Sequence, residues 1–113
     1  PAWIDRSATL AQVAAWVHRA ADERCDLVAF PEALVPGYPH WLSSAGGARF
    51  NDPAQKRWFA HYSDQAVIIE RGDLTSIQEA CRSTGVAAVV GIIDARPDVL
   101  RLAVNPERLR GAW

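Results

Sequence analysis

The chain has 113 residues, of which 50% are apolar and 22% are charged, a mixture typical of a globular protein rather than a disordered one. A chain of this length corresponds to one ordinary domain. Its 12 basic and 13 acidic residues are spread along the sequence and leave a formal net charge of −1. The sequence contains no basic stripe, so we do not expect it to bind nucleic acid or an anionic membrane.

The cysteines and the apolar runs bear on the compartment. Cys25 and Cys81 are isolated and lack CxxC spacing, which is typical of a reducing compartment without a disulfide framework. Residues 1–25 contain no apolar segment of the length that a signal peptide needs, and no run approaches the roughly 20 apolar residues of a membrane span. We therefore expect a soluble, cytoplasmic protein. Because the chain opens on Pro1 and contains no Met, we also expect a processed or incomplete product.

A helix is predicted over residues 8–24, where apolar residues recur at helical spacing. Thr9 and Gln12 form a capping box at its start. Residues 27–30, Leu-Val-Ala-Phe, do not alternate, as expected for a short strand covered on both faces. Pro31 ends this strand, because proline has no N–H to donate to a ladder.

A long loop is predicted over residues 33–51, which contain several proline and glycine turn signals. Loops of this length inside a domain tend to be functional or disordered. Asp52 and Pro53 are the N-cap and the first-turn proline of a helix predicted over residues 53–63.

The remaining elements complete an α/β pattern. Residues 66–69 are predicted to form a short extended piece, and residues 74–83 a helix that Asp73 caps and Gly85 closes. Residues 86–93 are predicted to form a second buried strand. This order of helices and strands predicts an α/β fold in which helices cover a sheet.

Glu32 stands directly after the first predicted strand. Ligands of open α/β sheets bind beyond the carboxyl ends of the strands, and a carboxylate there is a candidate general base whose pKa desolvation would raise. The alternative is a strand-end glutamate that caps a neighbouring loop by accepting backbone N–H groups. Position alone leaves both interpretations open, because a lone acid specifies no reaction.

The stretch LVAFPEALVPGYPHW, residues 27–41, resembles the first signature of the nitrilase superfamily, the carbon–nitrogen hydrolases. In that family a strand leads into a Phe-Pro-Glu stretch, which is matched here by residues 30–32. The PGYP stretch at 36–39 and the following Trp41 resemble the nitrile-hydrolysing branch more than the amidase or carbamoylase branches. EACRSTGVAAVVGI, residues 79–92, is similar to the helix-to-strand segment that follows in the family.

This resemblance implies a fold and a division of the chain. The fold is part of the four-layer α-β-β-α sandwich of the nitrilase type, incomplete in this chain. Residues 1–93 would be the amino-terminal part of a carbon–nitrogen hydrolase domain. Residues 94–113 would be a divergent tail, for which a frameshift or disorder is the expected explanation.

The resemblance also implies a reaction, the hydrolysis of a nitrile to a carboxylic acid and ammonia by a Glu-Lys-Cys triad without cofactor or metal. Glu32 takes the role of the catalytic glutamate. The other two members find no match, because Lys56 reads as a helix-face charge and neither Cys25 nor Cys81 has the setting of the family's nucleophile. We therefore expect the isolated polypeptide to be inactive.

Tyr38, His40 and Trp41 lie in the loop that, by resemblance, borders the substrate pocket, and they are the candidate substrate-binding residues. The alternative for Tyr38 and Trp41 is that they cover the end of the sheet. The expected substrate is a small nitrile, or an amide if the protein is closer to the aliphatic amidases. Self-association or a complete hydrolase subunit is the expected protein partner, and a non-catalytic interaction module or inactive partner subunit stays open.

Overall fold

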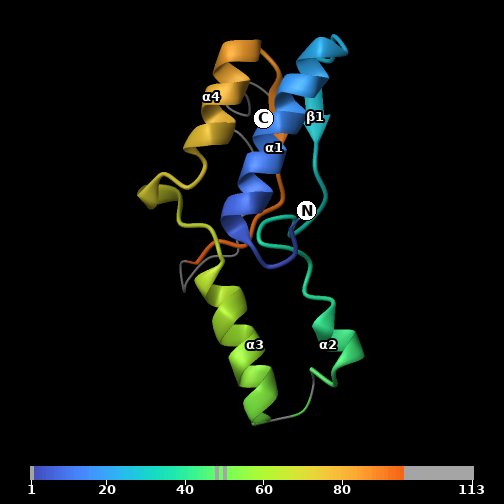
Figure 1. Cartoon of the computed structure of the whole chain (residues 1–113), viewed down its shortest axis with the longest axis vertical. Coiled ribbons are helices and arrows are strands. Elements are labelled where there is room, and N and C mark those ends of the chain that lie inside the picture. The colour runs from blue at the N-terminus through green and yellow to red at the C-terminus, as the bar shows by residue number, and fades with distance from the viewer. Residues whose placement is uncertain (1, 48, 50, 96–113) are drawn as a thin grey trace, which may run out of the picture.

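The computed structural model describes residues 2–47, 49 and 51–95. Its elements, in chain order, are α1 (Arg6–Asp22), β1 (Leu27–Ala29), α2 (Trp41–Ser44), α3 (Pro53–Asp64), the short 3-10 helix η1 (Ile69–Arg71), α4 (Thr75–Thr84) and β2 (Ala87–Val89). In Figure 1, α1 and α4 lie beside the strands, and α2 and α3 occupy the opposite end of the molecule. Helices and strands mix as expected for an α/β protein.

The two strands form a parallel sheet. Residues 27–29 of β1 pair in register with residues 87–89 of β2. Pairing continues beyond the strands at two isolated bridges, Val35 with Ile92 and Val67 with Asp94. The predicted second strand is therefore shorter than residues 86–93, but the segment that contains it goes on pairing with two successive partners.

One face of this sheet is closed by α1 and α4, which pack against each other and contact the strands. The apolar stripe predicted for the first helix is confirmed, because it turns Leu10, Val13 and Val17 into the interior. The buried residues form two clusters, one of Leu10, Val13, Val35, Val67, Ile77, Val90 and Ile92, the other of Val17, Ala20, Ala80 and Val86. Apolar area removed from water in these clusters is the main stabilising contribution.

The prediction that the first strand is covered on both faces is wrong for the part of the chain that the structure describes. Val28 is half-buried and packs against the second cluster, whereas Leu27 is 56% exposed and Ala29 is exposed as well. Successive side chains of a strand point to opposite faces, so the face that carries Leu27 and Ala29 is open. Among the described residues, the helices that contact the strands, α1 and α4, lie on the other face.

The helix boundaries differ from the predictions at two caps. The first helix begins at Arg6, and its N-cap is Asp5, whose carboxylate accepts the N–H of Ala8. The predicted capping box at Thr9 is therefore wrong, because the Thr9 hydroxyl is buried and donates to the Ala2 carbonyl instead. By contrast, the Asp52 cap of α3 is confirmed, as is the ending of α4 at Gly85.

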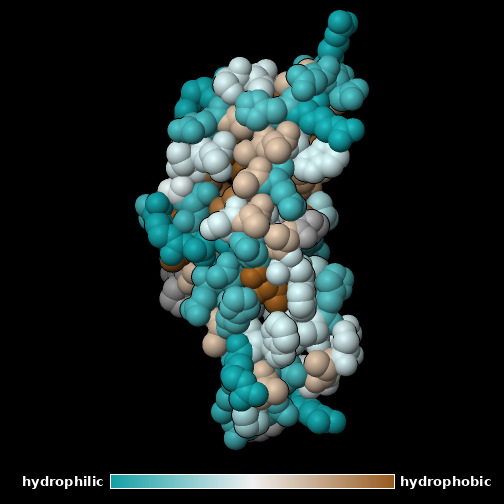
Figure 2. Space-filling view, viewed as in Figure 1, coloured by the Kyte–Doolittle hydropathy of each residue, from teal (hydrophilic) through white to brown (hydrophobic). Residues whose placement is uncertain are grey.

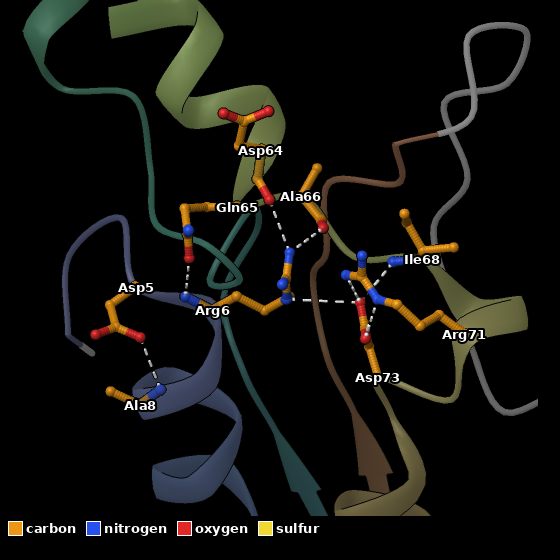
Figure 3. A network of polar contacts seen from close by, with 9 residues as sticks. All are labelled: Asp5, Arg6, Ala8, Asp64, Gln65, Ala66, Ile68, Arg71 and Asp73. Atoms are coloured by element: carbon orange, nitrogen blue, oxygen red, sulfur yellow. Dashed lines mark hydrogen bonds and ion pairs between the residues drawn. The ribbon is translucent and has the colours of Figure 1, made fainter.

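Asp73 does not cap α4, because its carboxylate is held by other partners (Figure 3). It accepts the N–H of Ile68 at 2.8 Å and Nε of Arg71 at 2.8 Å, and lies 3.6 Å from Nε of Arg6. Hydrogen bonds from Arg71 hold the pKa of Asp73 below its ordinary value, and the N–H of Ile68 and the charge of Arg6 act in the same direction.

Arg6 extends this network to the end of α3. Its Nη1 donates to the carbonyls of Asp64 at 2.8 Å and Ala66 at 2.9 Å, and its backbone N–H donates to Oε1 of Gln65 at 2.9 Å. The start of α1 is thereby tied to the segment that joins α3 to α4 (Figure 3).

The surface shown in Figure 2 is mostly hydrophilic, with a small hydrophobic area near its centre. Among the described helices, none has the length and apolar character that a membrane span requires.

The Asp73 network leads to a first prediction. Asp73→Ala should lower the free energy of unfolding by about 1–3 kcal/mol near neutral pH, because the N–H of Ile68 loses its acceptor and the Arg6 guanidinium loses its ion-pair partner. The folded-state pKa lies below the ordinary value of 3.8, so this contribution is present above that value and is lost as the pH falls through the folded pKa. The difference between wild type and variant should therefore shrink below about pH 4.

Urea unfolding at several pH values measures this difference. Asp64→Ala is the matched control, because Asp64 has an exposed side chain and contacts Arg6 only through its backbone carbonyl. Its effect should stay within about 0.5 kcal/mol. Equal losses in the two variants would contradict the assignment.

Candidate active site

Glu32 lies on a turn that interrupts the pairing of the two strands. The N–H of Phe30 donates to the Val89 carbonyl at 2.8 Å before the turn, and the N–H of Val35 donates to the Gly91 carbonyl at 3.2 Å after it. Glu32 is exposed between these two points. Its predicted place directly after a paired strand is confirmed.

The Glu32 carboxylate makes no hydrogen bond or ion pair within the described ranges 2–47, 49 and 51–95. The alternative interpretation, a carboxylate that caps a neighbouring loop, therefore finds no support in this part of the chain. A carboxylate held at the end of a paired strand without a structural partner is available to accept a proton from a reactant.

The loop that follows is fixed through three consecutive carbonyls. The Pro36 carbonyl accepts the N–H of Ile4 at 2.8 Å, the Gly37 carbonyl accepts the Tyr62 hydroxyl at 3.0 Å, and the Tyr38 carbonyl accepts Nε1 of Trp3 at 3.0 Å. Gly37 has φ +137°, and a Cβ there would lie 2.9 Å from Cδ1 of Trp3, so only glycine fits. Donors from two remote segments thus hold this loop in one conformation.

Two of the three candidate substrate residues lie together on the surface. The rings of Tyr38 and His40 are 4.9 Å apart, and both residues are exposed. They belong to the loop that begins after the Glu32 turn, which agrees with a position at the border of a site. Their contact with a substrate stays a prediction.

Trp41, the third candidate, is 4% exposed and occupies the centre of an aromatic cluster. Its ring centroid lies between 4.9 and 6.3 Å from those of four other residues, Trp3, Trp58, Phe59 and Tyr62. Its Nε1 is buried without a hydrogen-bond partner in the described part of the chain. This packing joins α2 to α3, and the role of Trp41 toward a substrate stays a prediction.

Comparison with known proteins assigns the family. The family model of carbon–nitrogen hydrolases matches residues 1–107. The chain belongs to the carbon–nitrogen hydrolase family. It is 32% identical over 96 residues to an aliphatic nitrilase of Rhodococcus rhodochrous. The aligned region covers 81% of this chain and 24% of that protein.

Two other relatives give the same picture. An arylacetonitrilase of Aspergillus oryzae is 26% identical over 80% of this chain and 25% of its own length, and a cyanide hydratase of Leptosphaeria maculans is 24% identical over 91% of this chain and 28% of its own. This carbon–nitrogen hydrolase chain therefore spans about a quarter of the length of these relatives. The resemblance to nitrilases of the carbon–nitrogen hydrolase family is confirmed.

The family match extends past residue 93, where the sequence led us to expect a divergent tail. Within the described residues, Asp94 still pairs with Val67, and the N–H of Ala95 donates to the Val67 carbonyl. The rest of the expected tail, residues 96–113, lies outside the described residues, so its divergence stays a prediction.

In the part of the chain that the structure describes, neither Lys56 nor either cysteine forms a hydrogen bond or ion pair with Glu32. Lys56 is exposed on α3, and Cys25 is exposed just before β1. Cys81 is half-buried and packs against both core clusters, and this burial raises the pKa of its thiol. A nucleophilic cysteine needs a lowered pKa, so Cys81 has the opposite environment. Among the described residues no group of three or more His, Cys, Asp or Glu is placed to hold a metal ion.

Two contributors to the site carried no sequence signal of their role. Tyr62 falls in the helix predicted over residues 53–63, and Trp3 precedes the first predicted helix, but neither position indicated a contact with the loop. Tyr62 donates a hydrogen bond to a loop residue 25 positions away in sequence, and Trp3 to one 35 positions away. No local pattern could have shown these contacts. The concentration of aromatic residues in the loop and in α3 was the nearest available sign.

The loop contacts give a second prediction. Tyr62→Phe should lower the free energy of unfolding by about 1 kcal/mol near neutral pH, because the Gly37 carbonyl loses its donor. Burial raises the pKa of Tyr62 from 10.0 to about 12, with a smaller contribution from Tyr38. The protonated phenol therefore contributes fully below pH 10.0, and its contribution is lost as the pH rises through the folded value of about 12.

Urea unfolding of Tyr62→Phe measures the loss in the free energy of unfolding. The raised pKa is measured by an alkaline titration of tyrosinate absorbance in Tyr38→Phe, in which Tyr62 is the remaining tyrosine of the chain. We expect a midpoint well above the one that the same variant gives in urea. Coinciding midpoints would show that Tyr62 is not buried against the loop.

Proposed function

We propose that this chain is the amino-terminal part of a nitrilase-type hydrolase that converts a nitrile to a carboxylic acid and ammonia, with Glu32 as general base. The observation that carries this proposal is the position of Glu32, which lies exposed and unpartnered within the described residues at the end of a paired strand of a carbon–nitrogen hydrolase. The names of the relatives, two nitrilases and a cyanide hydratase, favour nitriles over amides.

In this reaction a cysteine thiolate attacks the nitrile carbon and forms a covalent thioimidate. One water then releases ammonia and leaves a thioester, and a second water releases the carboxylic acid and the free thiol. Glu32 would accept the thiol proton and later assist the attacking water. A lysine would stabilise the charge that develops on the reacting atom. Because Lys56, Cys25 and Cys81 do not fit these roles, we propose that the lysine and the thiol come from polypeptide beyond these 113 residues.

The open face of the sheet supports the proposed architecture. In a four-layer α-β-β-α sandwich, a second sheet would cover the face that carries Leu27 and Ala29, which is exposed in this chain. A strand with apolar side chains on both faces is typical of a sheet buried on both sides.

A chimaera tests the catalytic proposal. The matched segment of this chain replaces the corresponding segment of the Rhodococcus rhodochrous aliphatic nitrilase, and ammonia release is measured on a panel of nitriles and amides. We expect nitrile hydrolysis by the chimaera and a loss of about a hundredfold or more in Glu32→Gln, because a positioned general base contributes that much. The 113-residue chain alone should release no ammonia above background.

Glu79→Gln is the matched control, since Glu79 is an exposed glutamate on α4. It should leave the rate unchanged. Full activity of the folded Glu32→Gln chimaera, or Glu32-dependent ammonia release by the isolated chain, would refute the proposal. Faster turnover of amides than of nitriles would move the assignment to the amidase-like branch.

An association function is favoured by a separate observation, the exposure of large apolar side chains. Leu27 is 56% exposed on the open face of β1, and Trp16 is 52% exposed on α1. We propose that the open face drives self-association of the isolated chain, or its binding to a complete hydrolase subunit.

Light scattering after size exclusion, at several concentrations, measures this association. Leu27→Glu should shift the chain toward monomer, whereas Trp16→Glu, on a helix rather than on the open face, should have the smaller effect. A monomer at every concentration in the wild type would contradict self-association.

A further inference from the structure

The two paired segments contain unequal numbers of residues between two pairing points, and Glu32 lies in the longer stretch. Ala29 pairs with Val89 and Val35 pairs with Ile92, so six residues of the first segment span the distance that three residues of the second segment span. The extra residues cannot stay in the plane of the sheet and are pushed out as a turn over residues 31–34. Glu32 lies on this turn.

Gly91 lies opposite the turn and in contact with its backbone. A Cβ on Gly91 would lie 2.4 Å from the Pro31 carbonyl oxygen, 2.8 Å from the Ala33 nitrogen and 2.8 Å from Cα of Glu32. All three atoms belong to the main chain, so no side-chain rotation could make room. Gly91 is therefore required for close approach of two backbones rather than for a left-handed conformation.

The turn cannot easily move away from Gly91. Its two ends are held by the hydrogen bonds of Phe30 and Val35 to the second segment, and the N–H of Ile93 donates to the Val35 carbonyl at 2.9 Å. Inside the turn, Ala33 is buried and has φ +51°, a left-handed conformation that costs free energy for a residue with a Cβ. Such a conformation persists only where the surroundings impose it.

We infer that Gly91 is a positioning residue for Glu32: its missing side chain creates the space in which the Glu32 turn is seated, and so sets where the carboxylate stands at the end of the strands. The catalytic meaning of this inference rests on the proposed function. Its structural content does not.

The test uses the isotopically labelled 113-residue chain and NMR. In the wild type, nuclear Overhauser effects should connect the Gly91 α-protons with the α-proton of Glu32 and the amide proton of Ala33. In Gly91→Ala, the carbon and amide shifts of residues 31–33 should change, and the Ala33 shifts should lose their left-handed signature.

Gly47→Ala is the matched control, because a Cβ on Gly47 would lie 2.6 Å from Cα of Leu42, a similar backbone collision outside the turn. It should leave the shifts of residues 31–33 unchanged. If Gly91→Ala fails to fold, the wild-type Overhauser effects decide the inference. Their absence would overturn it, as would unchanged shifts at residues 31–33 in a folded Gly91→Ala chain.

The chimaera separates this inference from the proposed function. Gly91→Ala should lower its kcat by about ten- to a hundredfold with little change in KM, since a small misplacement of a catalytic group costs that much. An active Glu32→Gln chimaera would refute the proposed function but leave the NMR result standing. A Gly91→Ala chimaera with unchanged kcat, beside an inactive Glu32→Gln, would overturn the inference about Gly91 alone.

Discussion

The structure depends on one constraint, the parallel pairing of the segment after α1 with the segment after α4. Parallel strands cannot be joined by a tight hairpin and need a long crossover, which here contains α2, α3 and α4. Because both strands run in the same direction, their carboxyl ends meet at one edge of the sheet, where ligands of α/β proteins bind. Glu32 and the loop at 36–40 come directly after the first strand and so lie at that edge.

Local sequence signals predicted those parts of the fold that local contacts determine. The apolar stripe of α1, the Asp52 cap of α3 and the ending at Gly85 all depend on residues within one or two turns of each other. Thr9 and Asp73 were misassigned as caps, although each is a good capping residue, because partners outside the helix that each was expected to cap take their side chains. The Ala2 carbonyl takes the Thr9 hydroxyl, and Arg71, Arg6 and Ile68 take the Asp73 carboxylate.

The candidate site divides in the same way. The position of Glu32 could be predicted, since an apolar strand followed by proline and glutamate is a local pattern. The burial of Trp41 could not, because its neighbours Trp3 and Trp58 come from opposite sides of it in sequence. The contact between Gly91 and the Glu32 turn could not be predicted either. It arises because the two segments contain different numbers of residues between the same two pairing points, which no single residue type indicates.

A general base works best when it is placed before the substrate arrives, since positioning then costs nothing during the reaction. For the proposed base Glu32, main-chain contacts would meet this requirement, because its turn is held at both ends by strand hydrogen bonds and packs against Gly91. The loop beyond it is held just as firmly by Ile4, Tyr62 and Trp3. In the proposed hydrolase, a thiol and a lysine supplied from elsewhere would therefore meet a glutamate whose backbone turn this chain already holds in place.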